Sequence, residues 1–304
     1  MRMTRISFLF CLFLTCMFFP SSLTAQEISF TFNPPDSTRA TEYTTKVEDE
    51  KAAFGETSSK CNLRSSLLFE KSDTNIIITS ILHDIECIRD GEIDTENEFS
   101  AMQNVPFVMI IDSKLRLDSL ANYEEMRDSM ITKDPYGAAE YMPETFDYEP
   151  VIINASRVWK NHIADFHGKT AEIGDTWTIV DTINNLNFTE IVEKTITFTE
   201  LIEYNDVGCV VIEFEHLSEL RFTEYYEEAM GKLYLESEEP TEYFELLGSS
   251  IKTTGKWIID PATMLYYYEH TEDNETLKMN MYGGMEISVQ STTVTETRTR
   301  YQTE

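Results

Sequence analysis

The side chains best suited to catalysis are few and scattered along the chain. The histidines of the sequence are His83, His162, His167, His216 and His270. Only His162 and His167 lie close together, and their i, i+5 spacing separates the rings on a helix, unlike the i, i+4 pair of a zinc-binding helix. A serine nucleophile needs a Gly-x-Ser-x-Gly turn, and Gly248-Ser-Ser lacks the second glycine. We therefore expect no catalytic residue, no metal site and no cofactor, and predict that the protein is not an enzyme.

Methionine and aromatic side chains are concentrated near the C-terminal end of the sequence. Methionine adapts to irregular apolar shapes, so it suits both protein cores and ligand grooves. Burial in a core is the favoured interpretation. If a curved sheet leaves an apolar groove open, however, the same region would line it together with a predicted helix. The candidate ligand-binding residues are Trp159, Ile163, Met264, Tyr266, Met279, Met281 and Met285.

The cysteines that follow the N-terminal apolar segment are Cys61, Cys87 and Cys209. Residues 57–70 and 76–88 have the pattern of two strands joined by a three-residue loop. That loop places Ser72 opposite Ile76, and the same register places the first two cysteines opposite each other. We predict that these two are cross-strand neighbours and candidates for a disulfide. Three independent buried thiols remain the alternative.

Most of the sequence after residue 26 alternates with period two, which is typical of half-buried antiparallel strands. Residues 195–202 and 209–214 follow this pattern, and so do residues 277–289, which turn at Gly283-Gly284. The final run, residues 291–303, is rich in threonine and charged side chains. We predict that this run is an exposed or edge strand.

Two segments have helical spacing instead. The first is a short helix that Asp118 or Ser119 could cap, with apolar positions at Leu120, Tyr123, Met126 and Met130. A longer helix is predicted to begin near Pro150, to carry Trp159 on its apolar stripe and to end before Gly168. Residues 131–149 between them are predicted to form a loop.

The first 25 residues have the features of a cleaved secretory signal. A basic start is followed by an apolar run over residues 6–19 and by small residues up to Ala25. A membrane anchor would need roughly 20 apolar residues, and Pro20 interrupts the run. A lipid anchor on Cys16 is disfavoured because no small residue precedes it. We therefore predict a periplasmic or secreted protein with no transmembrane segment after cleavage.

The formal net charge of −30 restricts the partners. Such a charge repels phosphate backbones, so nucleic acid is excluded as a partner. Hydrophobic residues make up 41% of the sequence and aromatic residues 12%, which is enough for a real core.

Three sequence segments resemble those of a family of uncharacterised exported bacterial proteins. They are Asn33-Pro-Pro-Asp36, the run from Gly168 to Gly174-Asp-Thr-Trp177, and Gly255-Lys-Trp-Ile-Ile-Asp260. The first departs from the family pattern because its usual Gly-Asp is missing. That family is similar to periplasmic lipoprotein carriers, which fold as an antiparallel half-barrel with helices in its concave face. The resemblance implies no catalytic residues and implies a role in holding an apolar ligand.

Together these observations predict a mainly β (α+β) fold: a curved open antiparallel sheet, or half-barrel, with two or three helices on its concave face. Residues 1–25 are the predicted signal peptide and residues 26–304 a single domain. Two pseudo-repeats within it, residues 27–120 and 168–290, would be joined by residues 121–167.

The predicted function is non-catalytic binding of an apolar or amphiphilic ligand, such as a lipid, in the periplasm or cell envelope. The alternative is a structural envelope component that binds another protein through an open strand edge at residues 291–303.

Overall fold

The computed structural model describes residues 27–52, 55–95, 97, 99–133, 143–184, 188–228, 244–281 and 285–302. The predicted signal peptide and the Gly283-Gly284 turn lie outside the described residues. So do residues 134–142 of the predicted loop between the two helices, whereas its remaining residues include the end of one helix and the start of the next.

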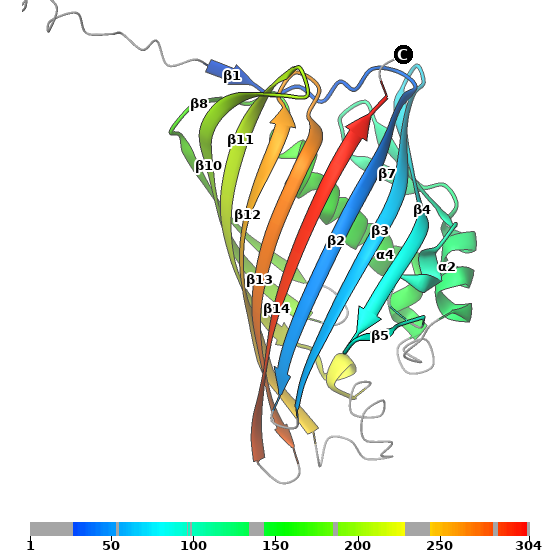
Figure 1. The fold of residues 1–304 in the computed structure, drawn as a ribbon, viewed down its shortest axis with the longest axis vertical. Coiled ribbons are helices and arrows are strands. Elements are labelled where there is room, and N and C mark those ends of the chain that lie inside the picture. The colour runs from blue at the N-terminus through cyan, green and yellow to red at the C-terminus, as the bar shows by residue number, and fades with distance from the viewer. Residues whose placement is uncertain are drawn as a thin grey trace, which may run out of the picture.

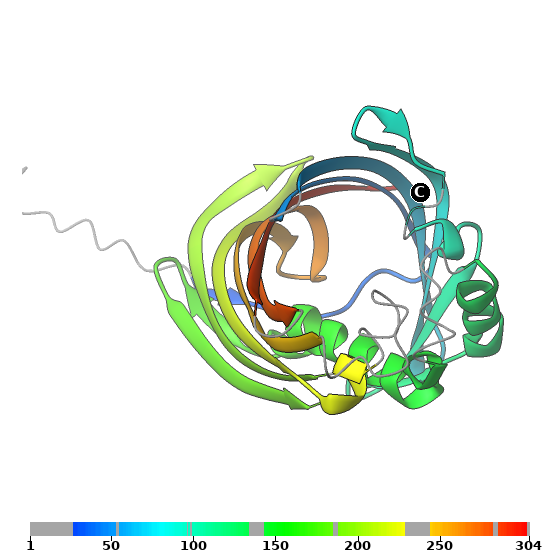
Figure 2. The same ribbon diagram turned by 90° about the horizontal axis from the view of Figure 1, so that it is seen from below.

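One antiparallel 12-stranded sheet dominates the described chain, and it curves strongly without closing on itself (Figures 1 and 2). Its strand order is β7-β6-β4-β3-β2-β14-β13-β12-β11-β10-β9, with β5 paired to β4. The prediction of a mainly β, open and curved antiparallel sheet is confirmed. The strands are β2 (Thr38–Ala52), β3 (Gly55–Lys71), β4 (Asn75–Arg89), β5 (Glu92–Ile93), β6 (Pro106–Asp112), β7 (Leu117–Leu120), β9 (Thr176–Asn184), β10 (Phe188–Tyr204), β11 (Val207–Phe222), β12 (Phe244–Asp260), β13 (Leu265–Met281) and β14 (Met285–Tyr301).

The curvature has local causes in the strands. Most strands of the central sheet are 15 to 17 residues long, so the twist between neighbours accumulates over a long path. Register shifts interrupt the pairing at Arg64/Ser65, Phe198/Glu200 and Leu246/Gly248. Bulges of this kind bend a strand and increase its local twist. The sheet is therefore a half-barrel with a concave and a convex face.

The helices lie at the open side of the half-barrel (Figure 2). Helix α2 (Tyr123–Thr132) packs beside β6, and helix α4 (Tyr148–Trp159) crosses between the two ends of the sheet. The expected cap of α2 is wrong, because Asp118 and Ser119 belong to β7 and Asn122 precedes the helix. Two 3₁₀ turns, η1 (Ser100–Met102) and η2 (Pro143–Phe146), complete this region.

Helix α4 begins close to the predicted Pro150 and continues into a π-helical turn, η3 (Lys160–Ala164). Gly168 follows with a φ of 74°, as expected for a residue that ends a helix. The indole Nε1 of Trp159 donates a 2.7 Å hydrogen bond to the carbonyl oxygen of Leu115, between β6 and β7. Arg157 pairs with Glu190 of β10 at 2.7 Å. Helix α4 is thus a strut attached to both ends of the open sheet.

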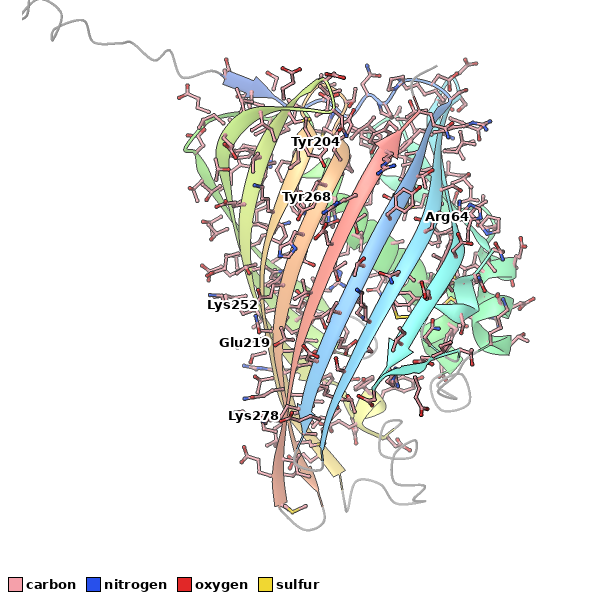
Figure 3. All side chains as sticks on the ribbon, in the orientation of Figure 1. Arg64, Tyr204, Glu219, Lys252, Tyr268 and Lys278 are labelled. Atoms are coloured by element: carbon pink, nitrogen blue, oxygen red, sulfur yellow. A yellow bond between two sulfur atoms is a disulfide. The ribbon has the colours of Figure 1, made fainter. Side chains whose placement is uncertain are left out.

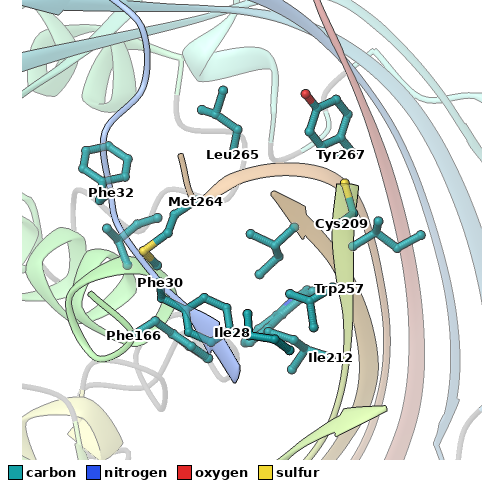
Figure 4. Close-up of a cluster of buried hydrophobic side chains, with 14 of the residues drawn as sticks. Ile28, Phe30, Phe32, Phe166, Cys209, Ile212, Trp257, Met264, Leu265 and Tyr267 are labelled. Atoms are coloured by element: carbon teal, nitrogen blue, oxygen red, sulfur yellow. The ribbon is translucent and has the colours of Figure 1, made fainter. Parts of the chain in front are cut away.

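A single large core lies between this strut, the sheet and the N-terminal segment (Figure 4). The segment starts with β1 (Glu27–Ser29), which pairs with β8 (Thr170–Glu172), and it inserts Ile28, Phe30 and Phe32 into the core. Phe30 contacts Phe166 with a centroid distance of 5.7 Å. The core therefore fills one end of the half-barrel, next to the β12–β13 turn.

The predicted edge position of residues 291–303 is wrong. Strand β14 is central, because it pairs with β13 on one side and with β2 on the other. Most inward positions of β14 are only half-buried, and threonine suits such positions. The polar composition of β14 therefore results from a solvent-accessible concave face and not from an edge position. The described sheet instead ends at β7 and β9.

Strands β3 and β4 form the predicted hairpin and place Cys61 directly opposite Cys87. These two residues form a disulfide with a Cα–Cα distance of 4.1 Å. The predicted register beside the turn is wrong by one residue, because Lys71 and not Ser72 lies opposite Ile76. His83 is an extra residue of β4 without a partner on β3, and it shifts the pairing by one residue. Beyond it the strands have the predicted register, so the two cysteines face each other.

Removing this disulfide should destabilise the fold. The bond closes a loop with a sequence separation of 26, so its loss frees the unfolded chain. We expect the Cys61→Ala/Cys87→Ala variant to lose about 2 to 3 kcal/mol of unfolding free energy. Urea titration of both proteins with and without reductant measures this. Reductant should destabilise only the parent protein, and an effect of reductant on the variant would contradict the assignment.

Candidate functional site

The concave face carries a row of polar side chains that crosses six neighbouring strands. Successive side chains of a strand point to opposite faces of the sheet. Phe198, Trp257 and Ile287 are buried on the concave face, so the residues that alternate with the same phase as these three point inward. Register then aligns one inward residue from each strand, from β10 to β2. This polar row consists of Lys194, His216, Thr253, Asp273, Thr293 and Glu48.

Apolar side chains flank the polar row on both sides. Towards the core lie Phe198, Ile212 and Trp257, which are all almost fully buried. Towards the far ends of β13 and β14 lie Leu277, Met279, Ile287 and Val289. Several inward residues of the middle strands are only half-buried, so solvent reaches the concave face outside the core. The concave face is therefore amphiphilic, with a polar band between two apolar regions.

Lys194 is the most unusual member of the row. It is only 8% exposed, and its ammonium lies 4.5 Å from the ring centroid of Trp257 and 5.5 Å from that of Phe214. No salt bridge or hydrogen bond joins it to another described residue. Burial lowers the pKa of Lys194 to about 8, although Asp165 and Glu269 attract its charge. The structure thus keeps a cation inside the fold with two aromatic faces as its near neighbours.

His216 lies directly opposite Lys194 on β11. Its Nε2 is buried and has no hydrogen-bond partner among the described residues. Burial lowers the pKa of His216, Glu190 opposes that shift, and the charge of Lys194 lowers the pKa further. An unpartnered buried polar atom is costly, so this part of the row has an unmet capacity for hydrogen bonding.

The carboxylates around the row, in contrast, have partners. Glu190 accepts a hydrogen bond from Ser218 and pairs with Arg157 of the strut. Glu269 accepts a 3.0 Å hydrogen bond from the indole of Trp257. Burial acts to raise the pKa of Glu269, but His162, Trp257 and Lys194 outweigh it, and the net pKa is lowered. These carboxylates are therefore satisfied, whereas neither the ammonium of Lys194 nor the Nε2 of His216 has a hydrogen-bond partner among the described residues.

The structure divides the predicted ligand-binding residues into two groups. Trp159, Ile163, Met264 and Tyr266 belong to or pack on the core. Met279 lies inward near the far end of β13, and Met285 is 48% exposed. The side chain of Met281 lies outside the part of the chain that the structure describes. Thirteen residues separate Tyr266 from Met279 along one strand, or about 40 Å, so the set does not form one site.

Sequence reasoning missed Lys194, His216 and Glu190. A signal was present, because Glu190 and Lys194 share the face of Val192, Ile196 and Phe198 at period two. A charged residue that interrupts the apolar positions of a strand indicates either a wet interior or a binding site. The alternation was recognised only from residue 195 onward.

Gly255 makes the aromatic contact beside Lys194 possible. A Cβ at this position would lie 2.3 Å from Cζ of Phe214 and 2.6 Å from the carbonyl oxygen of His270. We therefore expect Gly255→Ala to lower the unfolding free energy by about 1 to 3 kcal/mol. Gly208→Ala is the matched control, because a Cβ there meets nothing within 4 Å. Equal denaturation midpoints for the two variants would show that the close approach is not required.

The lowered pKa of Lys194 predicts a pH dependence of stability. Between about pH 8 and pH 10.5 the unfolded chain keeps a proton on this lysine that the folded protein has released. Folding therefore becomes more favourable as the pH rises through this window. We expect the stability of the parent protein to rise relative to Lys194→Met between pH 8 and pH 9.5. Parallel pH profiles of the two proteins in urea titrations would contradict this.

The convex face has a different character. Its alternate positions carry charged side chains such as Glu219, Lys252 and Lys278 (Figure 3). Lys252 pairs there with Glu215 at 2.8 Å. A hollow of about 450 Å³ on this face is lined mainly by threonine, glutamate, Lys256 and His270. The convex face therefore carries many charged side chains, among which exposed apolar residues such as Ile191 and Leu217 are interspersed.

The described residues contain neither a cluster of metal ligands nor a helix that could cross a membrane. No group of three or more His, Cys, Asp or Glu side chains in these segments is placed to hold a metal ion. No helix in the same segments is both long and apolar enough to cross a bilayer. The free thiol found in the described segments, that of Cys209, is buried, and burial raises its pKa to about 11. A thiol of this kind is unreactive at neutral pH.

No protein-family model and no curated protein matches the chain. Among solved structures, one of lipovitellin, described by its lipid–protein interactions, is 9% identical with a TM-score of 0.46. The match covers 90% of this chain, which spans 26% of that chain's length. An outer membrane channel from Pseudomonas putida F1 is 7% identical with a TM-score of 0.25, covering 88% of this chain and 97% of that one. OpdQ of Pseudomonas aeruginosa is 5% identical with the same TM-score, covering 89% and 100%.

At these identities and TM-scores the likenesses assign neither a family nor a function. The predicted kinship with exported proteins similar to lipoprotein carriers therefore stays a prediction. The curved open sheet expected from it is confirmed by the structure itself.

Proposed function

We propose that this is an exported, non-catalytic protein that binds an amphiphilic ligand on its concave face, in the periplasm or at the cell envelope. The observation that carries the proposal is the arrangement of the polar row between two apolar regions. An amphiphile matches the polar row and the apolar region along β13 and β14, with its polar group at the first and its apolar chain along the second.

The size of the apolar region supports a long chain as the ligand. Six residues separate Asp273 of the polar row from Met279 on the same strand. At about 3.3 Å per residue this distance is roughly 20 Å. One leaflet of a bilayer core is about 15 Å deep, so an acyl chain of ordinary length fits alongside β13 and β14.

Native mass spectrometry of the full chain, expressed with its signal and purified under gentle conditions, tests the proposal. The expected result is a protein mass accompanied by a bound lipid or fatty acid that extraction into organic solvent releases. A bare protein mass, together with no binding of added palmitate, would contradict the proposal.

Two adjacent residues of β14 provide matched variants for this test. Thr293 points inward in the polar row, whereas Thr292 points outward and donates a hydrogen bond to Asn274 on the convex face. We expect Thr293→Trp to reduce the amount of bound lipid and Thr292→Trp to leave it unchanged. Equal loss in both variants would place the ligand elsewhere.

A further inference from the structure

We infer that Lys194 and His216 together form the binding site for the anionic group of the ligand. This inference rests on the proposed function and names the chemical class of the ligand, an amphiphile with a carboxylate or phosphate group. It excludes neutral amphiphiles such as fatty alcohols as the preferred ligands.

Lys194 and the Nε2 of His216 are buried and lack a hydrogen-bonding partner among the described residues. Lys194 is nine-tenths buried and forms no ion pair with a described carboxylate. His216 is its direct cross-strand neighbour, and its Nε2 is buried without a hydrogen-bond partner among the residues that the structure describes. Side chains directly opposite on antiparallel strands have Cβ atoms about 4.5 to 5.5 Å apart, so one anionic group can contact both.

The carboxylates near Lys194 and His216 do not act as the anionic partner of this pair. Glu269 is engaged by Trp257 and His162, and Glu190 by Arg157 and Ser218. Across the row, Asp273 accepts a hydrogen bond from Thr253. Asp165 acts on Lys194 only through its charge at longer range. Glu269, Glu190 and Asp273 are thus committed to other partners.

The side chains around Lys194 also favour an anionic ligand that carries an apolar chain. Trp257 and Phe214 lie against the ammonium of Lys194, which keeps the cation out of water and strengthens a contact with an anion. The pair also lies at the polar row, where the apolar regions on either side could hold a chain attached to the anion. A lysine on the convex face, such as Lys252, has neither feature and pairs with Glu215.

The test compares palmitate with hexadecanol, which differ only in the charged group. We expect the parent protein to bind palmitate at least tenfold more tightly than hexadecanol at neutral pH, measured by tryptophan fluorescence. In Lys194→Met this preference should disappear, because palmitate loses the contact with the ammonium. Lys252→Met is the matched control and should keep the preference. Lys194→Gln provides a second variant with a polar side chain, and it should behave like Lys194→Met.

The outcomes separate this inference from the proposed function. Equal binding of palmitate and hexadecanol by the parent protein would overturn the inference and leave amphiphile binding intact. A preference for palmitate that survives in both Lys194 variants would also overturn it. Failure to bind either compound would overturn the inference and the proposed function together. If a phospholipid with a phosphate group displaces palmitate competitively, the shared anion site is supported and a lipid headgroup is its source.

Discussion

Replacing Trp159 by alanine is expected to lower the free energy of unfolding by about 3 to 5 kcal/mol. Trp159 is 7% exposed and packs edge-on against Phe32 of the N-terminal segment, with a centroid distance of 5.1 Å. The substitution removes a large buried side chain and also leaves the carbonyl of Leu115 without its donor. Because that bond attaches helix α4 to the β6–β7 end of the sheet, the loss should loosen the open side of the half-barrel.

Val158 is the matched control for this substitution, because it is the adjacent residue of the same helix and is 53% exposed. We expect Val158→Ala to change the unfolding free energy by less than about 0.5 kcal/mol. Trp159→Phe should lie between the two, since it retains most of the packing but not the hydrogen bond. Chemical denaturation of the three variants measures this order. Similar midpoints for Trp159→Ala and Val158→Ala would contradict the role of the strut.

Replacing Arg157 by methionine is expected to cost about 3 to 5 kcal/mol. Arg157 supplies the cation for Glu190, which is 6% exposed and would otherwise keep a buried negative charge. Ser218 would still donate a hydrogen bond to Glu190, so the carboxylate remains partly satisfied and the effect lies near the lower limit. The pair joins helix α4 to β10, at the opposite end of the sheet from Trp159.

The neighbouring pair between Lys160 and Asp181 provides the control. Its side chains are 53% and 43% exposed, and they lie 3.2 Å apart. Exposed pairs contribute at most about 1 kcal/mol, so Lys160→Met should be almost neutral. The double variant Arg157→Met/Glu190→Gln should regain stability relative to Arg157→Met, because no unpaired buried charge remains. Equal stability of Arg157→Met and Lys160→Met would show that the buried pair does not secure the helix.

Local features of this fold could be predicted from the sequence. The alternation in β10, β11 and β13 is visible in consecutive residues, and so are the stripe of helix α4 and the facing cysteines of the β3–β4 hairpin. Each depends on residues that are near one another along the chain.

Long-range features could not be predicted in the same way. Strand β14 became central because β2, from the other end of the chain, pairs along its outer side. No local pattern in β14 identifies that partner. The polar row was missed for a related reason, since the sequence shows alternation but does not reveal which face of a curved sheet stays wet. Lys194 and His216 face each other across the β10–β11 hairpin, but the sequence does not show that their shared face is the concave one.

Photoaffinity labelling most directly tests the claim that the concave face binds an amphiphile. The full chain would be irradiated with a palmitate analogue that carries a diazirine on its acyl chain, and the labelled peptides would be mapped to single residues. The account predicts saturable labelling of inward residues of β13 and β14, such as Leu277 and Val289, which unlabelled palmitate suppresses. Labelling confined to their outward neighbours, such as Lys278 and Ser288, would contradict it.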